Sequence, residues 1–184
     1  MSALERYGQL RGQIDAFNTR VDRLQGPYLN CKRGCDGCCR TRRTAWAVEV
    51  EAIAQWLSTQ PQALRESLRA RLTDASVQAG ERCVFLDADG ACAVYPARPV
   101  ICRTHGPAVQ TAEEGLVWCG LNFEDMSPEQ VVEALTSEAV LNLDHLNKML
   151  VLINTMYLQE QPVGQQPEPR LSLEAALTGP SAAE

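Results

Sequence analysis

The stretch Cys31-Lys32-Arg33-Gly34-Cys35-Asp36-Gly37-Cys38-Cys39 decides the fold, because it places four cysteines within nine residues. A C-x2-C turn lets two thiolates converge on one tetrahedral ion, since its tight bend turns both side chains inward. Gly34 and Gly37 lie beside and inside this turn and permit the backbone to fold tightly. Side chains of adjacent residues diverge, so Cys38 and Cys39 serve two different ions, or one is a ligand and the other supports it.

Four more cysteines follow at wider spacing. Two of them, Cys83 and Cys92, flank Asp87-Ala88-Asp89-Gly90, and an Asp-Gly between apolar runs is typical of a β-hairpin. Pairing of the two arms would bring these sulfurs together. The candidate metal ligands are thus Cys31, Cys35, Cys38, Cys39, Cys83, Cys92, Cys102 and Cys119. Eight thiolates form two four-thiolate sites, or one cluster and a mononuclear site, and the spacing leaves both open.

Buried free thiols and disulfides are the competing interpretations of these cysteines. The share of 8 in 184 residues is well below the roughly 8–10% of a secreted disulfide scaffold. Residues 1–6 carry charged side chains and no apolar signal region, and no stretch approaches the roughly 20 apolar residues of a membrane span. We therefore expect a cytoplasmic protein, in which clustered cysteines mark metal or redox sites.

Basic residues crowd the same loops, at Lys32, Arg33, Arg40, Arg42, Arg43, Arg98 and Arg103. Cations near a thiolate-rich site stabilise its negative charge. A nucleic-acid patch is the alternative, but the loops lack interleaved aromatic residues and the chain carries a net charge of −6. We expect these side chains to balance the charge of the cysteine cluster, and nucleic-acid binding is not expected.

Outside the cysteines the hydrophobic pattern predicts a mainly α fold with a small β-hairpin, a compact helical domain around a cysteine-rich metal-binding loop region. An apolar stripe predicts an N-terminal helix over 4–25, ended by Gly26-Pro27. Further helices are expected over 46–57, from Pro61 to about residue 72, over 128–137 and over 138–159, and a short strand over 115–119. One domain would span 1–160, with its metal-binding core at 28–120, and 161–184 would be a mobile tail.

The two histidines are weaker candidates. His105 follows Cys102 by three residues, so it is either a ligand that replaces a cysteine or an ordinary loop residue. His145 lies in an apolar-striped helix beside Asp144 and Lys148, the setting of a helix-surface residue.

The cysteine arrangement resembles the YkgJ-type cysteine-cluster family, a zinc- or iron-chelating domain of bacteria. The resemblance covers roughly residues 28–120. It rests on the cysteines at 31, 35, 38 and 39, on Cys83-Val84-Phe85-Leu86, on Gly90-Ala91-Cys92-Ala93-Val94-Tyr95, and on Arg98-Pro99 and Cys102-Arg103. It implies that all eight cysteines belong to the metal site and that Arg98, Pro99 and Arg103 support it. The gap between Cys31 and Cys35 is one residue longer than in the family pattern.

Three functions are compatible with this pattern. In the first, zinc or iron is structural or stored, because eight cysteines leave no open coordination position. In the second, an iron–sulfur centre serves a redox or protein-modifying enzyme; related clusters occur in flagellin lysine methylases, but no catalytic residue and no nucleotide or flavin motif is recognised. In the third, the metal only staples loops, and the N-terminal helix or the tail binds a protein partner; residues 171–177 would form a brief helix on it.

Overall fold

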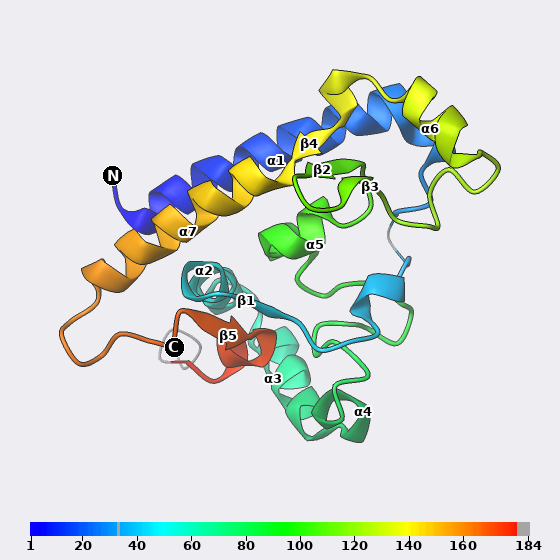
Figure 1. Cartoon of the computed structure of the whole chain (residues 1–184). Helices are drawn as coiled ribbons and strands as arrows, with labels where there is room; N and C mark the ends of the chain where they lie inside the picture. Colours follow the sequence, from blue (N-terminus) through cyan, green and yellow to red (C-terminus); the bar gives the residue numbers. More distant parts are fainter. Residues whose placement is uncertain (33, 180–184) are drawn as a thin grey trace.

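The structure is a computed structural model, and it describes residues 1–32 and 34–179. Its two longest helices, α1 (Ala3–Gln25) and α7 (Leu143–Glu160), run antiparallel side by side (Figure 1). A capping box begins α1, in which Ser2 accepts from the Glu5 backbone and Glu5 accepts from the Ser2 backbone. The carboxylate of Glu160 accepts from the Ala3 backbone N–H at 2.9 Å, which joins the start of α1 to the end of α7.

The hydrophobic core has two parts. In the first, the apolar stripe of α1, including Leu10 and Ile14, packs against Leu146 and Leu150 of α7 and against the first turn of α2 (Ala47–Ser58). The second lies on the other side of α2, whose Ile53 and Leu57 contact α3 (Gln62–Ala70) and the segment around Phe85. Helix α2 therefore connects the helical pair to the part of the chain that carries most of the cysteines.

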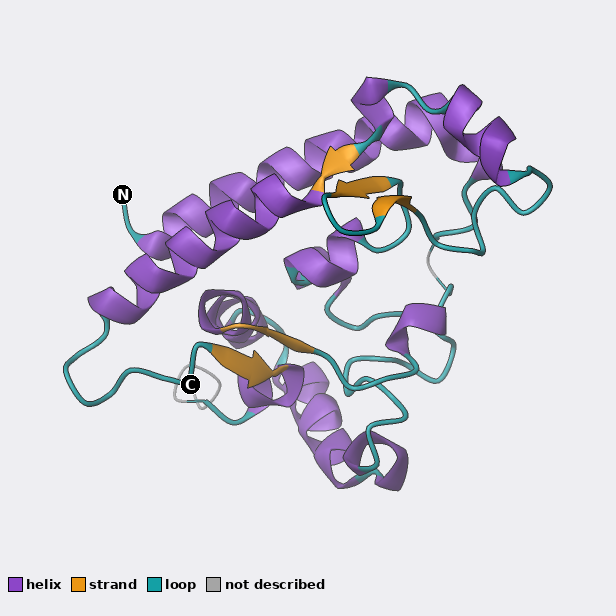
Figure 2. Cartoon of the chain, viewed as in Figure 1, coloured by secondary structure: helices purple, strands orange, loops and turns teal. Residues whose placement is uncertain are grey.

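Short elements connect these helices, as Figure 2 shows. The 3-10 segments η1 (Gly26–Tyr28), η2 (Gly37–Cys39), η3 (Arg71–Thr73), η4 (Tyr95–Ala97) and η5 (Ser137–Ala139) mark turns of the chain. The remaining short helices are α4 (Ala75–Gln78), α5 (Val100–Thr104) and α6 (Pro128–Ala134). No helix among the described residues is both long enough and apolar enough to cross a membrane.

Two small sheets complete the fold. Strand β2 (Val109–Thr111) pairs antiparallel with β3 (Gly115–Val117) and parallel with β4 (Leu141–Asn142). Strand β1 (Thr44–Trp46) pairs antiparallel with β5 (Arg170–Ser172), with Ala45 opposite Leu171. The predicted mainly α class with small strands is confirmed, and β3 falls within the strand expected over 115–119.

The small hairpin lies elsewhere than predicted. Residues 83–95 form turns joined by one isolated bridge between Leu86 and Cys92, whereas β2 and β3 form the hairpin of the structure. A half-buried strand alternates buried and exposed side chains. Here Val84, Phe85 and Leu86 are buried in succession, at 1%, 1% and 2% exposure. The segment therefore enters the core as a turn rather than lying on it as an arm of a hairpin.

Other boundaries also differ from the sequence-based expectation. The helix expected over 128–137 ends three residues early, at Ala134. The predicted helix over 138–159 begins only at Leu143, because η5 and β4 occupy residues 137–142. The expected mobile tail is wrong for residues 170–177, where β5 and the 3-10 helix η6 (Leu173–Leu177) pack on the chain's own core. Leu173, Ala176 and Leu177 are buried, so these residues belong to the folded domain. The last five residues of that tail, 180–184, lie outside the described part.

Candidate metal centre

The cysteine-rich loop follows α1 and turns sharply at η2, which contains Cys38 and Cys39. Two backbone carbonyls anchor this turn. The guanidinium of Arg43 donates to the carbonyl oxygen of Cys38 at 3.1 and 3.2 Å, and the N–H of Cys83 donates to the carbonyl oxygen of Cys39 at 2.8 Å. The second bond joins the loop to the segment that carries Cys83 and Cys92, although the two lie some forty residues apart in sequence.

A cavity of about 560 Å³ lies between this loop, the face of α1 around Asn18, and α5. Seven of the eight predicted ligands line it: Cys31, Cys35, Cys38, Cys39, Cys83, Cys92 and Cys102. Cys119 is absent from its walls. The fold therefore brings cysteines from three separate stretches of the chain around one space.

These thiols surround the cavity without yet converging. In the part of the chain that the structure describes, no three His, Cys, Asp or Glu side chains lie close enough to hold an ion as they stand. All eight are nevertheless free cysteines, and thiolates are the donors that zinc and iron–sulfur centres take. The donor set fits such a group chemically, because seven of these thiols line one cavity.

The cysteines differ in their readiness to lose a proton. A hydrogen bond from the Cys39 thiol, helped by the nearby charges of His105 and Arg43, lowers the pKa of Cys38 to about 6. The same contact raises the pKa of Cys39. Burial raises the pKa of Cys83 to about 11 and that of Cys102 to about 12. At neutral pH without metal, Cys38 is therefore mostly a thiolate, whereas Cys83 and Cys102 keep their protons.

Arg103 fixes one wall of the cavity. Its side chain is 5% exposed, donates to the carbonyl oxygens of Arg98 at 2.7 Å and Pro96 at 2.6 Å, and forms an ion pair with Asp15 of α1. Arg98 lines the same cavity and places its guanidinium carbon 3.7 Å from the centroid of the Tyr95 ring. Both predicted arginines therefore lie at the site, Arg103 as the residue that holds the neighbouring loop in place.

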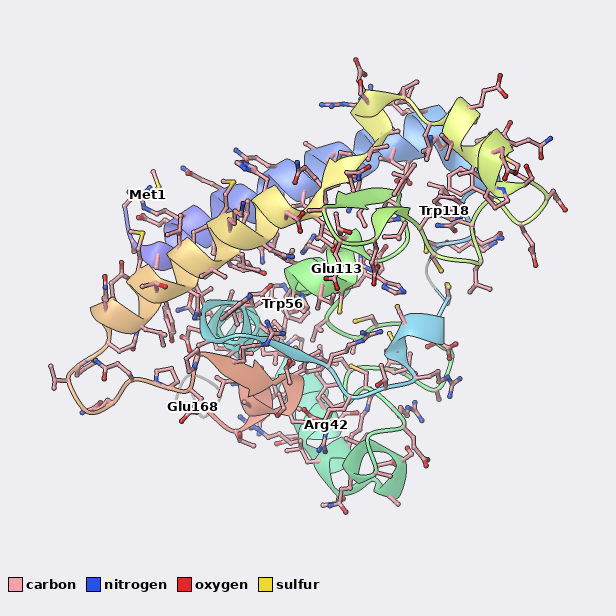
Figure 3. All side chains as sticks on the ribbon, viewed as in Figure 1. Met1, Arg42, Trp56, Glu113, Trp118 and Glu168 are labelled. Carbon is pink, nitrogen blue, oxygen red and sulfur yellow. The ribbon has the colours of Figure 1, made fainter. Side chains whose placement is uncertain are left out.

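The other basic residues are divided between the site and the surface. Lys32 lines the cavity, and Arg43 holds the Cys38 carbonyl. Arg40 pairs with Asp36, and Arg42 pairs with Glu174 at 3.2 Å, between the C-terminal segment and α4 (Figure 3). Arg33 lies outside the described residues. The predicted charge-balancing role thus has no support at Arg40 and Arg42, whose acidic partners are side chains of the chain itself.

Two residues that sequence analysis missed also shape the site. The buried carboxylate of Glu49 accepts from the N–H of Val100 at 2.7 Å and from that of Trp46 at 2.9 Å, which anchors the start of α5 and hence Cys102. The amide of Asn122 donates to the Gly106 carbonyl oxygen at 2.8 Å and lies 3.7 Å from Cys31 Sγ. Neither residue stands in a recognisable motif, so only the folded chain reveals them.

The two histidines lie in different surroundings, one at the cavity and one on the surface. His105 lines the cavity, and its charge acts on Cys38, so it stays a candidate ligand or hydrogen-bond partner. His145 is exposed in the first turn of α7, where its N–H donates to the Asn142 side chain at 2.8 Å. It has the helix-surface position expected from the sequence.

A mainly helical fold with thiols gathered around one cavity defines a cysteine-cluster protein of the metal-binding class. Residues 30–120, about half of the chain, match the family model CxxCxxCC, described as a putative zinc- or iron-chelating domain. The chain belongs to this family. The match agrees with the resemblance drawn from the cysteine spacing and supports metal binding in general. No curated protein and no solved structure matches the chain.

Proposed function

We propose that the chain chelates zinc or iron through its clustered cysteines and that the metal has a structural or storage role. The observation that carries this proposal is the shared cavity, whose walls bring together cysteines from residues 31–39, 83–92 and 102. An ion held by thiolates from all three stretches would join them covalently, as structural zinc sites do.

The protonation of the thiols supports the same function. Cys83 and Cys102 are largely buried with pKa values raised to about 11 and 12, so they exchange a proton for a metal ion without placing an unpaired charge in the interior. Arg98 at the cavity would offset part of the negative charge that remains on a four-thiolate site, whereas the charge of Arg103 is already paired with Asp15. The proposal requires a reducing compartment such as the cytoplasm.

An iron–sulfur centre in a redox or protein-modifying enzyme is the second candidate. The cavity of about 560 Å³ has room for a multinuclear cluster as well as for single ions, so its size allows this candidate. The adjacent Cys38 and Cys39, one with a lowered and the other with a raised pKa, also suit a centre whose cysteines have unequal roles. Catalytic residues are not assigned under either candidate.

The alternative of a metal-stapled interaction module has less support. The apolar stripe of α1 is used against α7, and residues 171–177 pack on the core rather than on a partner. Both segments that suggested a protein partner thus have partners within the chain.

Elemental analysis of the full chain purified without oxygen tests the proposal, together with its visible absorption spectrum. We expect stoichiometric zinc without colour, or iron with the charge-transfer bands of a sulfur-ligated centre. The paired substitution Cys83→Ser with Cys102→Ser should abolish metal binding at the cavity. Protein that is folded by circular dichroism but lacks stoichiometric metal would overturn the proposal.

A further inference from the structure

The carboxamide of Asn122 connects three separate stretches of the chain beside the cysteine cavity. Its oxygen accepts from the Asn30 N–H at 2.8 Å, and its nitrogen donates to the Gly106 carbonyl oxygen at 2.8 Å and to Cys31 Sγ at 3.7 Å. An amide NH₂ group has two hydrogens, so one serves the carbonyl oxygen and the other faces the sulfur. Asn122 therefore holds the sulfur of Cys31 and the backbone of the residue before it at the same time.

The orientation of this amide is fixed by its partners. An exchange of its oxygen and nitrogen would set its NH₂ group against the Asn30 N–H and its oxygen against the Gly106 carbonyl oxygen, two contacts between like groups. Asn122 is 2% exposed, so it would be costly to leave these bonds unmade. Its backbone N–H also donates to the Cys119 carbonyl oxygen at 2.9 Å. The side chain thus keeps an N–H group directed at Cys31.

Gly106 limits the space around the same sulfur. A Cβ at this position would lie 2.6 Å from Cys31 Sγ, so the sulfur occupies the place that a side chain would fill. The Gly106 carbonyl oxygen also accepts from the Cys119 N–H at 3.2 Å, which ties this residue to the loop that carries Asn122. Cys31 is exposed to solvent, yet the protein groups beside its sulfur are held by the loop from residue 106 to 122.

An N–H group directed at sulfur favours the ionised, metal-binding form of the thiol. Hydrogen bonds to a charged acceptor are roughly twice as strong as bonds between neutral groups, so a thiolate gains more from this donor than a thiol does. The thiolate is the form that binds metal, and hydrogen bonds from neighbouring groups orient metal ligands. Cys31 lines the cavity, so a thiolate held at this position borders the space shared with the other cysteines.

Resting on the proposed function, we propose that Asn122 is a positioning residue for the metal centre. Its N–H donates to the metal-bound sulfur of Cys31 and holds that sulfur at the cavity wall as a ligand. Asn122 does not bind the metal itself, because the Asn30 N–H occupies its oxygen and an amide nitrogen donates but does not accept. Cys31, although exposed, thereby takes the same part in the centre as the more shielded cysteines.

A purely structural role of Asn122 makes a different prediction. Its loss would then lower the stability of the loop, and the bound metal would keep all its ligands. Asn154 offers a comparison within the chain, because it is also 2% exposed and bonds two backbone groups. It accepts from the Val48 N–H at 3.1 Å and donates to the Pro169 carbonyl oxygen at 3.4 Å, both outside the cysteine segments.

Cobalt substitution tests the proposal on the full chain, prepared metal-free under reducing, oxygen-free conditions. Co²⁺ bound by thiolates gives a charge-transfer absorption whose intensity per ion rises with the number of sulfur ligands, and Zn²⁺ competition with a chelator gives the affinity. We expect Asn122→Ala to weaken Zn²⁺ binding by about 10–100-fold and to reduce the Co²⁺ absorption per bound ion, as Cys31→Ser does. Asn154→Ala should lower the free energy of unfolding and change neither metal measurement.

The double substitution shows whether Asn122 acts through Cys31. In the Cys31→Ser background, Asn122→Ala should not weaken Zn²⁺ binding further, because the residue that it positions is already lost. A full additional loss in that background, or unchanged affinity of the folded Asn122→Ala variant, would overturn the proposal.

Cys31→Ser keeps the proposal testable if Asn122→Ala does not fold, because Cys31 is exposed. A cobalt spectrum unchanged by Cys31→Ser would show that Cys31 is no ligand and would overturn the role given to Asn122. A wild-type chain that binds neither Co²⁺ nor Zn²⁺ would instead overturn the proposed function itself.

Discussion

The backbone N–H of Val100 donates a hydrogen bond of 2.7 Å to the carboxylate of Glu49, which is only 2% exposed. This bond joins the first turn of α2 to the first turn of α5, the short helix that carries Cys102. A carboxylate at two helix starts is favourably placed, because the free N–H groups there carry partial positive charge. Glu49 thus connects the helical core to the cysteine cavity.

Substitution of Glu49 by Gln should change how stability depends on pH. Burial raises the pKa of Glu49 above its ordinary value of 4.5. The native state therefore binds a proton at Glu49 more tightly than the unfolded state does. Protonated Glu49 contributes its full stabilisation below pH 4.5, and this contribution is lost as the pH rises through the native pKa. In the wild-type chain this loss lowers the free energy of unfolding as the pH rises. Glu49→Gln, which cannot titrate, should remove that decrease, as measured by urea titration at several pH values. Glu113→Gln, at an exposed turn, is the control and should leave the pH dependence of the free energy of unfolding as it is in the wild-type chain.

Removal of the carboxylate altogether should be more severe. Glu49→Leu leaves the N–H groups of Trp46 and Val100 without this acceptor, at a cost of roughly 1–3 kcal/mol for each buried donor. Equal stability of the Leu and Gln variants would show that these hydrogen bonds do not hold α5.

Arg103→Lys should destabilise the fold although it conserves charge. The guanidinium contacts Asp15 and two carbonyl oxygens in different directions, and one ammonium group cannot reproduce that fork. We expect a loss of roughly 1.5–3 kcal/mol in the free energy of unfolding, measured in denaturant. Arg40→Lys is the matched control, because its pair with Asp36 is exposed and the change should stay within about 0.5 kcal/mol. Similar losses in both variants would contradict the role given to Arg103.

Gly106→Ala should displace Cys31. The new methyl group would meet Cys31 Sγ at 2.6 Å, on a backbone with positive φ. Gly115→Ala separates the two effects, since Gly115 also has positive φ, at 75°, but open space around it. Each should lose about 1–3 kcal/mol from backbone strain, and only Gly106→Ala should also make Cys31 react faster with iodoacetamide. Unchanged reactivity of Cys31 in that variant would show that the close packing is unimportant.

Leu173→Ala tests whether the C-terminal segment belongs to the core. Leu173 is 3% exposed and lines the cysteine cavity, so its truncation should cost about 2–5 kcal/mol in a denaturant titration. Leu152→Ala, at a site 66% exposed on α7, should cost far less. If the two variants unfold at the same denaturant concentration, residues 170–177 do not contribute to stability as the packing indicates.

The helices were predictable because their signals are local. Helix α1 ends where its apolar stripe meets Gly26-Pro27. Helix α6 begins after the N-cap Ser127, at Pro128. A brief helix over 171–177 was expected on a partner, and its packing on the chain's own core was missed. Pro, Gln and Gly dominate residues 161–169, and pairing of β5 with β1 depends on a strand more than a hundred residues away. The hairpin predicted at residues 83–95 was misplaced for another reason. The turn around Asp89-Gly90 is present, but Val84, Phe85 and Leu86 are all buried, where a strand of a hairpin would alternate buried and exposed side chains.

The candidate site was predictable in composition and not in arrangement. Cysteine spacing and a family resemblance predicted the candidate ligands and two supporting arginines, Arg98 and Arg103. The structure places seven of these cysteines and both arginines around one cavity. Asn122 and Glu49 act through geometry alone, because an isolated Asn or Glu carries no signal until the backbone groups it contacts are known. The position of Cys119 outside the cavity wall, where its N–H bonds the Gly106 carbonyl oxygen, likewise depends on how the loop from Gly106 to Asn122 folds.

X-ray absorption at the metal edge of the anaerobically purified full chain tests metal binding by the cysteines most directly. We expect the nearest scatterers of the bound metal to be sulfur, at about 2.3 Å from a zinc ion. A metal surrounded only by nitrogen and oxygen atoms would contradict the cysteine centre.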